Sequence, residues 1–259
     1  MDSDQRSPIK DKPLRHAGQS LEEERRAILE DKVEPYLFMA LVFVLLAAFE
    51  WWRWYANIPP KPILFALMAC GSIALAAWQI RRHRPHMKAL RQGAEGEKAV
   101  GQFLERLREQ EYQVFHDIVG PGFNVDHVLI GRAGIFTIET KTWSKPAKGE
   151  ARITFRDGHL LAAGNEPDRD PIVQARAQAH WLGKLLSEST GRPLKAIPVV
   201  AFPGWFVEQS SERPTDMWVL EPKALPAFIE NEPLRLTAPD VKLASYHLSR
   251  FIRSVERDR

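Results

Sequence analysis

Two long apolar runs near the start of the sequence limit most strongly what this chain can fold into. Residues 36–49 and 63–80 contain no charged side chain, and the proline-rich segment NIPPKP lies between them. A membrane-spanning helix needs about 20 mostly apolar residues, and the first run continues through EWWRWY to Tyr55. The sequence therefore predicts a transmembrane helical hairpin over residues 36–80.

The alternative is a buried helical hairpin inside a soluble fold. Neither run has a polar stripe, and Trp51, Trp52 and Trp54 occupy the place where an interfacial aromatic belt is expected. Glu50 and Arg53 are costly deep in a bilayer, so we expect that the first helix ends near the interface or that these two charges pair. Both features favour the membrane.

The basic residues predict the orientation of the hairpin. Residues 81–92 hold five Lys or Arg and no acid, whereas the turn between the two runs holds only Lys61, with Arg53 at its edge. By the positive-inside rule, both termini face the cytoplasm. We expect a multi-pass protein of the inner or plasma membrane, with the basic stretch also contacting anionic lipid.

The charge distribution divides the chain further. The predicted parts are a cytoplasmic N-terminal tail over 1–35, the hairpin over 36–80, a basic juxtamembrane linker over 81–92 and a soluble domain over 93–259. The soluble part has 22 Lys or Arg and 23 Asp or Glu, so the pI near 9.0 comes largely from the anchor. The single cysteine, Cys70, excludes an internal disulfide framework and a cysteine-based zinc cluster.

The soluble part opens with GAEGEKAVGQFLERLREQEY, which has the spacing of an amphipathic helix. Val100, Phe103, Leu104 and Leu107 recur at helical spacing and form its apolar stripe. Glu97 lies three residues before this stripe, at the edge of the buried face. It either stabilises the helix start through the helix dipole or points toward a site.

Three predicted strands follow: YQVFHDIV, NVDHVLIG and GIFTIETKTW, the last two joined by a tight GRAG turn. Alternation puts Thr137, Glu139 and Lys141 on one face of the third strand. Asp126, near the start of its antiparallel partner, can lie beside the charged half. Three charged groups can therefore converge at one end of the hairpin.

Two carboxylates and an ammonium group in this position have two interpretations. One is a cross-strand ion pair on a solvated sheet face. The other is a Mg2+ site in which Asp126 and Glu139 share the cation, and Lys141 stabilises a phosphate or helps to deprotonate a water. The flanking residues are those of a buried strand, where unpaired charge is costly, and this favours a site.

The rest of the sequence predicts further elements of the same domain. RITF and HLLAA form a second hairpin, DPIVQARAQAHWL begins a helix, AIPVVAFPGW and DMWVL extend the sheet, and two helices follow. His116, His127 and His180 are expected to be packed or surface histidines rather than ligands, although His127 adjoins Asp126.

Three segments, GAEGEKAV, FNVDHVLIGRAGIFTIETKTW and DPIVQARAQAHWL, together resemble the nuclease-related domain (NERD), a branch of the PD-(D/E)XK nuclease superfamily. The resemblance covers residues 93 to about 205. It implies an α/β fold: a restriction-endonuclease-like core with a mixed central sheet flanked by helices, here preceded by the two transmembrane helices. The proline that gives the superfamily its name is absent, and Val125 precedes Asp126 instead. This departure removes no metal ligand.

The resemblance also implies roles for five residues. Asp126 and Glu139 would hold the metal, Mg2+ or Mn2+, and Lys141 would be the catalytic lysine. Glu97 would assist the metal shell, and Gln174 would support the site from the following helix.

Two functions therefore remain open. The first is a membrane-anchored, Mg2+-dependent nuclease that hydrolyses phosphodiester bonds of DNA or RNA. The second is a catalytically silent nuclease fold that serves as a membrane-tethered binding or scaffold protein. The intact Asp, Glu and Lys favour the first, whereas the near-neutral soluble domain favours the second, because phosphate contacts usually come from clustered Lys and Arg.

Overall fold

The computed structural model describes residues 14–59, 62–146, 150–156, 158–167, 170–209 and 216–257. The described chain divides into two compact units. Residues up to Gln19 and from Gly93 onward form one, here called the sheet unit, and Ser20–Gln92 form the other, the hairpin unit.

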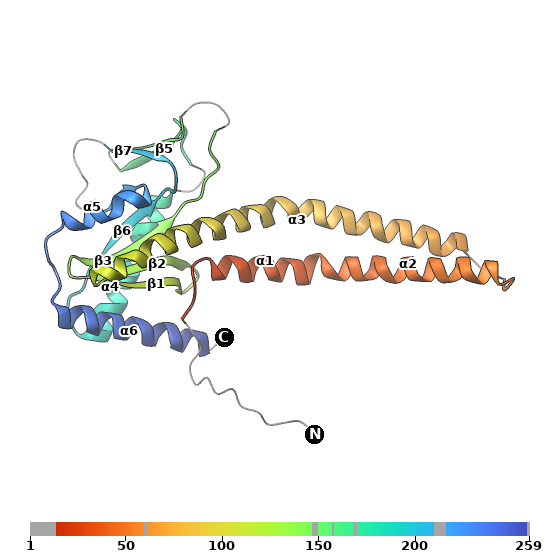
Figure 1. Cartoon of the computed structure of the whole chain (residues 1–259), viewed down its shortest axis with the longest axis horizontal. Helices are drawn as coiled ribbons and strands as arrows, with labels where there is room; N and C mark the ends of the chain where they lie inside the picture. Colours follow the sequence, from red (N-terminus) through yellow and green to blue (C-terminus); the bar gives the residue numbers. More distant parts are fainter. Residues whose placement is uncertain are drawn as a thin grey trace, which may run out of the picture. The chain divides into compact units, whose positions relative to one another are not determined.

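The hairpin unit is helical throughout its regular structure (Figure 1). It contains α1 (Gln19–Lys32), α2 (Glu34–Tyr55) and the first part of α3 (Pro62–Glu105). Within the described residues, two helices are long and apolar enough to cross a membrane by length and composition. Arg53 donates to Glu50 at 2.8 Å, so the two charges at the end of the first apolar run pair, one of the two expected arrangements.

The stretch 81–92, predicted as a linker, lies inside α3. Its Arg, Lys, Met, Leu, Ala and Gln residues all favour helix. Pro85 lies within the helix and cannot donate its backbone hydrogen bond, so the helix continues at the cost of that bond. The sequence offered no boundary between the apolar run and the helix that carries Glu97.

The sheet unit contains a five-stranded sheet in the order β1-β2-β3-β6-β8. The strands are β1 (Gln113–Val119), β2 (Asn124–Gly131), β3 (Gly134–Thr140), β6 (Ala196–Ala201) and β8 (Trp218–Leu220). The first three are antiparallel, and β6 and β8 continue in parallel to β3, so the sheet is mixed as predicted. Hydrophobic side chains alternate between its two faces, which makes each face a core.

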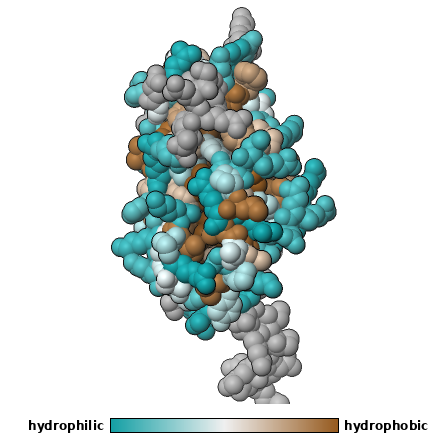
Figure 2. Space-filling model, turned by 90° about the vertical axis from the view of Figure 1, so that its left-hand side faces the viewer, coloured by the Kyte–Doolittle hydropathy of each residue, from teal (hydrophilic) through white to brown (hydrophobic). Residues whose placement is uncertain are grey.

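Helices cover both faces of this sheet (Figure 1). One core packs the sheet against the end of α3, η1 (Arg106–Gln110), η2 (Pro222–Ala224) and α5 (Leu225–Glu230). The other packs it against α4 (Pro171–Thr190) and α6 (Ala238–Arg257). Hydrophilic residues cover most of the surface shown in Figure 2, as expected for a fold that buries its apolar side chains.

A second, three-stranded sheet has the order β5-β4-β7. It comprises β4 (Arg152–Arg156), β5 (His159–Ala162) and β7 (Phe206–Gln209), and the predicted RITF/HLLAA hairpin is its β4–β5 pair. A third core joins this sheet to α4 and to the β6–β8 side of the main sheet through Ile153, Phe155, Ile172 and Phe202. The small sheet therefore lies near the end of β6.

The chain before α1 packs against the sheet unit. Arg15 is buried and donates to Asp117 at 2.8 Å and to Glu256 at 2.7 Å. Gly18 has a positive φ of 76°, and a Cβ there would lie 3.0 Å from the Ala94 carbonyl oxygen. Residues 14–18, here called the N-terminal segment, are thus part of the sheet unit.

Candidate active site

Asp126 and Glu139 lie on neighbouring antiparallel strands at the same end of the main sheet. His127 of β2 is in register with Ile138 of β3. Because the strands are antiparallel, Asp126 and Glu139 are the next pair along, toward the C-terminal end of β3. Asp126 accepts a hydrogen bond from the Thr140 backbone N–H at 2.7 Å. Glu139 is almost fully buried, with 3% of its surface exposed.

The ammonium group of Lys141 completes this arrangement just past the end of β3. Its Nζ donates to Glu139 Oε1 at 2.6 Å and to Gln174 Oε1 at 3.1 Å. The Lys141 backbone N–H donates to the Ala201 carbonyl at 2.9 Å, which extends the β3–β6 pairing and fixes the start of the side chain. The structure thus brings Glu139, Lys141 and Gln174 into one hydrogen-bonded group.

Gln178 belongs to the same group and was missed by the sequence analysis. Its Nε2 donates to Glu139 Oε2 at 2.6 Å and to the Asn124 carbonyl at 2.8 Å, and only 1% of the residue is exposed. The signal was its position one helical turn after Gln174, which puts both amides on one side of α4. Both carboxylate oxygens of Glu139 therefore have a donor.

Glu97 reaches the site from α3. A Cβ at Gly96 would lie 1.8 Å from Thr142 Oγ1, so glycine is needed where this helix crosses the chain after β3. Glu97 has 7% of its surface exposed, and the backbone N–H of Gly18 donates to its carboxylate. Burial, followed by the charges of Asp117 and Glu139, raises its pKa to about 8.

The carboxylates repel one another. Burial, followed by the charges of Glu139 and Glu97, raises the pKa of Asp126 well above its usual value, although the Thr140 N–H and the Lys141 ammonium oppose this. Three carboxylates thus face one ammonium group. A further cation at this point would relieve the repulsion and keep the acids ionised.

The donor set fits a hard cation such as Mg2+. This ion is usually bound through one or two carboxylates and keeps several waters. Within the described residues, no group of three His, Cys, Asp or Glu side chains is arranged to hold a metal ion. Any ion held by Asp126 and Glu139 would therefore take its other oxygens from water, substrate or backbone carbonyls.

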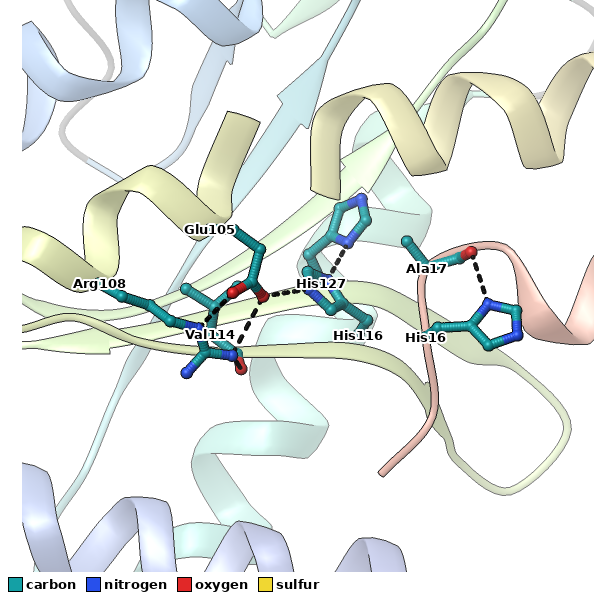
Figure 3. Close-up of polar contacts among 7 residues, drawn as sticks. All are labelled: His16, Ala17, Glu105, Arg108, Val114, His116 and His127. Carbon is teal, nitrogen blue, oxygen red and sulfur yellow. Dashed lines mark hydrogen bonds and ion pairs between the residues drawn. The ribbon is translucent and has the colours of Figure 1, made fainter. Parts of the chain in front are cut away.

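A second polar group joins Glu105 of α3, His116 of β1 and His127 of β2 (Figure 3). His116 Nε2 is 2.8 Å from Glu105 Oε1, and His116 Nδ1 is 2.9 Å from His127 Nδ1. With His116 Nε2 donating to the carboxylate, His116 Nδ1 accepts from His127. His127 Nε2 then carries a lone pair and has no partner in the described part of the chain.

Burial lowers the pKa of both His116 and His127, the latter well below its usual value. Although His127 follows Asp126 in sequence, alternation turns the two side chains to opposite faces of the sheet. His127 is fully buried, as expected for a packed histidine, and His180 lies exposed on α4.

Residues 92–203 match the family model of the nuclease-related domain. The chain carries a nuclease-related domain. This confirms the predicted resemblance, and the mixed α/β fold with two long apolar N-terminal helices agrees with it. The matched residues include all five predicted site residues and Gln178, and they end before β8.

The chain is also similar to an uncharacterized protein of Bacillus anthracis. The two are 32% identical over 86 residues, which is 31% of this chain and 39% of the relative. The match thus spans well under half of the relative's length. No solved structure matches the chain.

Proposed function

We propose that the nuclease-related domain hydrolyses phosphodiester bonds of DNA or RNA with the help of Mg2+ or Mn2+ held by Asp126 and Glu139. The observation that carries this proposal is the position of Lys141 Nζ, which is hydrogen-bonded to Glu139 and Gln174. It lies beside the group of carboxylates formed by Glu97, Asp126 and Glu139. A buried ion pair with a purely structural role would not need the second and third carboxylates close by.

Each residue has a role in this proposal. Lys141 binds a non-bridging phosphate oxygen and stabilises the charge that develops during hydrolysis. Gln174 orients the Lys141 ammonium, and Gln178 fixes the rotamer of Glu139 through its second oxygen. Glu97 would assist the metal shell, and a bound cation would keep its carboxylate ionised. A bound divalent ion would lower the pKa of a water and polarise the phosphate.

The experiment is a cleavage assay with the full chain in detergent. Single- and double-stranded DNA and RNA are incubated with and without Mg2+, and wild type is compared with Lys141→Ala. The expected result is metal-dependent cleavage that falls by about 100-fold or more in the variant. Lys184→Ala is the matched control, because this exposed α4 lysine pairs with Glu188 at 3.8 Å and does not line the cavity beside Lys141. Wild-type cleavage by Lys141→Ala would refute the assignment.

The second candidate function is a membrane-tethered binding or scaffold module. It is favoured by the near balance of Lys and Arg with Asp and Glu in residues 93–259. Calorimetry distinguishes the two functions. Mg2+ or Mn2+ binding that disappears in Asp126→Ala supports the enzyme, and no binding at millimolar concentration supports the scaffold.

We further propose that residues 36–80 anchor the protein in the inner or plasma membrane, with both ends of the hairpin in the cytoplasm. The contacts of Arg15 with Asp117 and Glu256 support this orientation. They join the chain before α1 to the chain after α3, and two segments in contact must lie on the same side of a membrane. The basic stretch 81–92 would then contact anionic lipid.

A further inference from the structure

A cavity of about 590 Å3 opens beside Lys141. Its size falls in the range of about 300–1,000 Å3 that is typical of small-ligand sites. The lining includes Lys141, Trp143, Ser144, Asn165, Glu166 and Trp205. These residues come from the chain after β3, the chain after β5 and the chain between β6 and β7, so loops that adjoin the small sheet build much of the wall.

Trp143 provides a fixed aromatic surface in this cavity. Its ring packs on Phe202 with centroids 5.0 Å apart and planes at 57°, and its carbonyl accepts a hydrogen bond from Trp205 Nε1 at 3.3 Å. The residue is partly exposed, whereas Trp205 is buried. An aromatic ring that is held on one side and accessible on another is a stacking platform for a flat ligand.

The charges of the lining residues limit the ligand further. Among the described residues that line the cavity, Lys141 carries the only positive charge, and Glu166 adds a negative one. A run of phosphates would be repelled by Glu166 and would find one ammonium group among these described residues. A neutral nucleobase needs no cation, and its edge can bond to the amide of Asn165 and the carboxylate of Glu166.

We propose that this cavity binds one unpaired nucleobase of the substrate, stacked on Trp143, with the adjoining phosphate at Lys141. The identity of the occupant rests on the proposed nuclease function. A base within a continuous duplex would have to leave its stack and its partner to enter. The domain therefore selects single-stranded nucleic acid, or an unpaired end, over continuous duplex.

The test is a binding experiment that requires no turnover. The full chain in detergent carries Asp126→Asn, EDTA is present, and fluorescein-labelled single-stranded and hairpin-duplex oligonucleotides are titrated. Trp143→Ala is expected to weaken single-strand binding roughly 5- to 150-fold, the factor that corresponds to the loss of one stacked base. Trp143→Phe keeps most of the affinity, and duplex binding is weak and unchanged. Tyr246→Ala, an exposed aromatic that does not line the cavity, serves as the control.

A second measurement leaves the cavity intact, in case Trp143→Ala disturbs the packing on Phe202. The same Asp126→Asn chain is titrated with single strands in which one nucleotide is abasic. One position should lose affinity by the factor seen with Trp143→Ala, and the other positions should lose little. Equal loss at every position, or equal loss for duplex and single strand with Trp143→Ala, overturns the proposal. If wild type cleaves nothing but these binding results hold, the nuclease function fails and the base site stands.

Discussion

Large apolar side chains are mostly buried in the sheet unit and mostly exposed in the hairpin unit. Leu67 in the hairpin unit has 67% of its surface exposed, and many neighbours along both apolar runs resemble it. In the sheet unit, Phe136, Leu182 and Val199 are fully buried, and exposure like that of Leu234 is an exception. Exposed apolar side chains, as in the hairpin unit, are favourable in a hydrocarbon solvent. Buried apolar side chains, as in the sheet unit, are favourable in water.

The two units also treat charge differently. The sheet unit buries Arg15, Glu97, Asp117 and Glu139, and Asp126 lies beside this group half-buried. Among its described residues the hairpin unit has one buried acid, Glu50, which pairs locally with Arg53. Local pairing makes a charge tolerable, whereas a cluster of buried acids keeps a net charge that needs a further partner. The comparison therefore separates a locally paired charge in the hairpin unit from the buried carboxylates of the candidate site in the sheet unit.

The largest expected effect tests the difference in apolar exposure between the two units. Leu67→Arg and Leu234→Arg change equally exposed leucines, at 67% each. An arginine costs up to about 2.5–3.5 kcal/mol in a membrane helix, the value at the helix centre, so Leu67→Arg should reduce the fraction of chains that resist carbonate extraction from membranes. Leu234→Arg should not change it. Equal retention of both variants would show that the apolar runs do not face lipid.

The next effect concerns buried polar contacts in the sheet unit. Gln178→Leu leaves one oxygen of Glu139 and the Asn124 carbonyl without their donor, and should lower the free energy of unfolding by about 1–3 kcal/mol. Gln174→Leu removes an exposed contact and should change it by about 0.5 kcal/mol or less. Amide hydrogen exchange of β3 measures both. Similar protection in the two variants would contradict the assigned role of Gln178.

A third effect compares two glycines of α3, one in each unit. Gly96→Ala places a methyl group 1.8 Å from Thr142 Oγ1, and should cost about 1–2 kcal/mol and reduce cleavage by displacing Glu97. Gly71→Ala meets no atom within 4 Å and should be neutral or slightly stabilising. Hydrogen exchange and the cleavage assay provide the measurements. A neutral Gly96→Ala would mean that the helix need not approach β3 so closely.

The smallest effect is the pH dependence of the sheet unit. Because the folded pKa of His127 and His116 lies below 6.5, their contribution to stability is present above that pH and is lost as the pH falls below it. Glu97 and Asp126, with raised pKa values, have the opposite sign: their contribution is lost as the pH rises, for Glu97 up to about 8.

His127→Gln should therefore reduce the stability loss on acidification below pH 6.5, and should leave the alkaline side unchanged. Hydrogen exchange of β2 amides from pH 5 to 8, with each rate corrected for intrinsic exchange, measures the difference between variant and wild type. If the protection of β2 falls equally with pH in the variant and in wild type, His127 is not held neutral by burial.

Much of the architecture was predictable because it depends on local patterns. Alternation and the GRAG turn gave the β2–β3 hairpin, and the same alternation placed Glu139 and Lys141 on one face. The capping position of Asp170 and the proline after it set the start of α4, so the helix carrying Gln174 was also expected.

The rest depends on contacts between distant residues. Gln178 acquires its role only when α4 packs beside Asn124 and Glu139, 54 and 39 positions away. The cavity at Trp143 requires the small sheet to pack near the end of β6, which no periodicity encodes. The N-terminal segment looked like a polar tail, because the partners of Arg15 lie 102 and 241 positions later.

That last separation has a consequence for the order of synthesis. Glu256 is translated 241 residues after its partner Arg15, and both apolar helices lie between them. A hairpin that enters the membrane as it is made would be inserted well before this contact can form. The contact between the N-terminal segment and α6 would then form only after both apolar helices had been made.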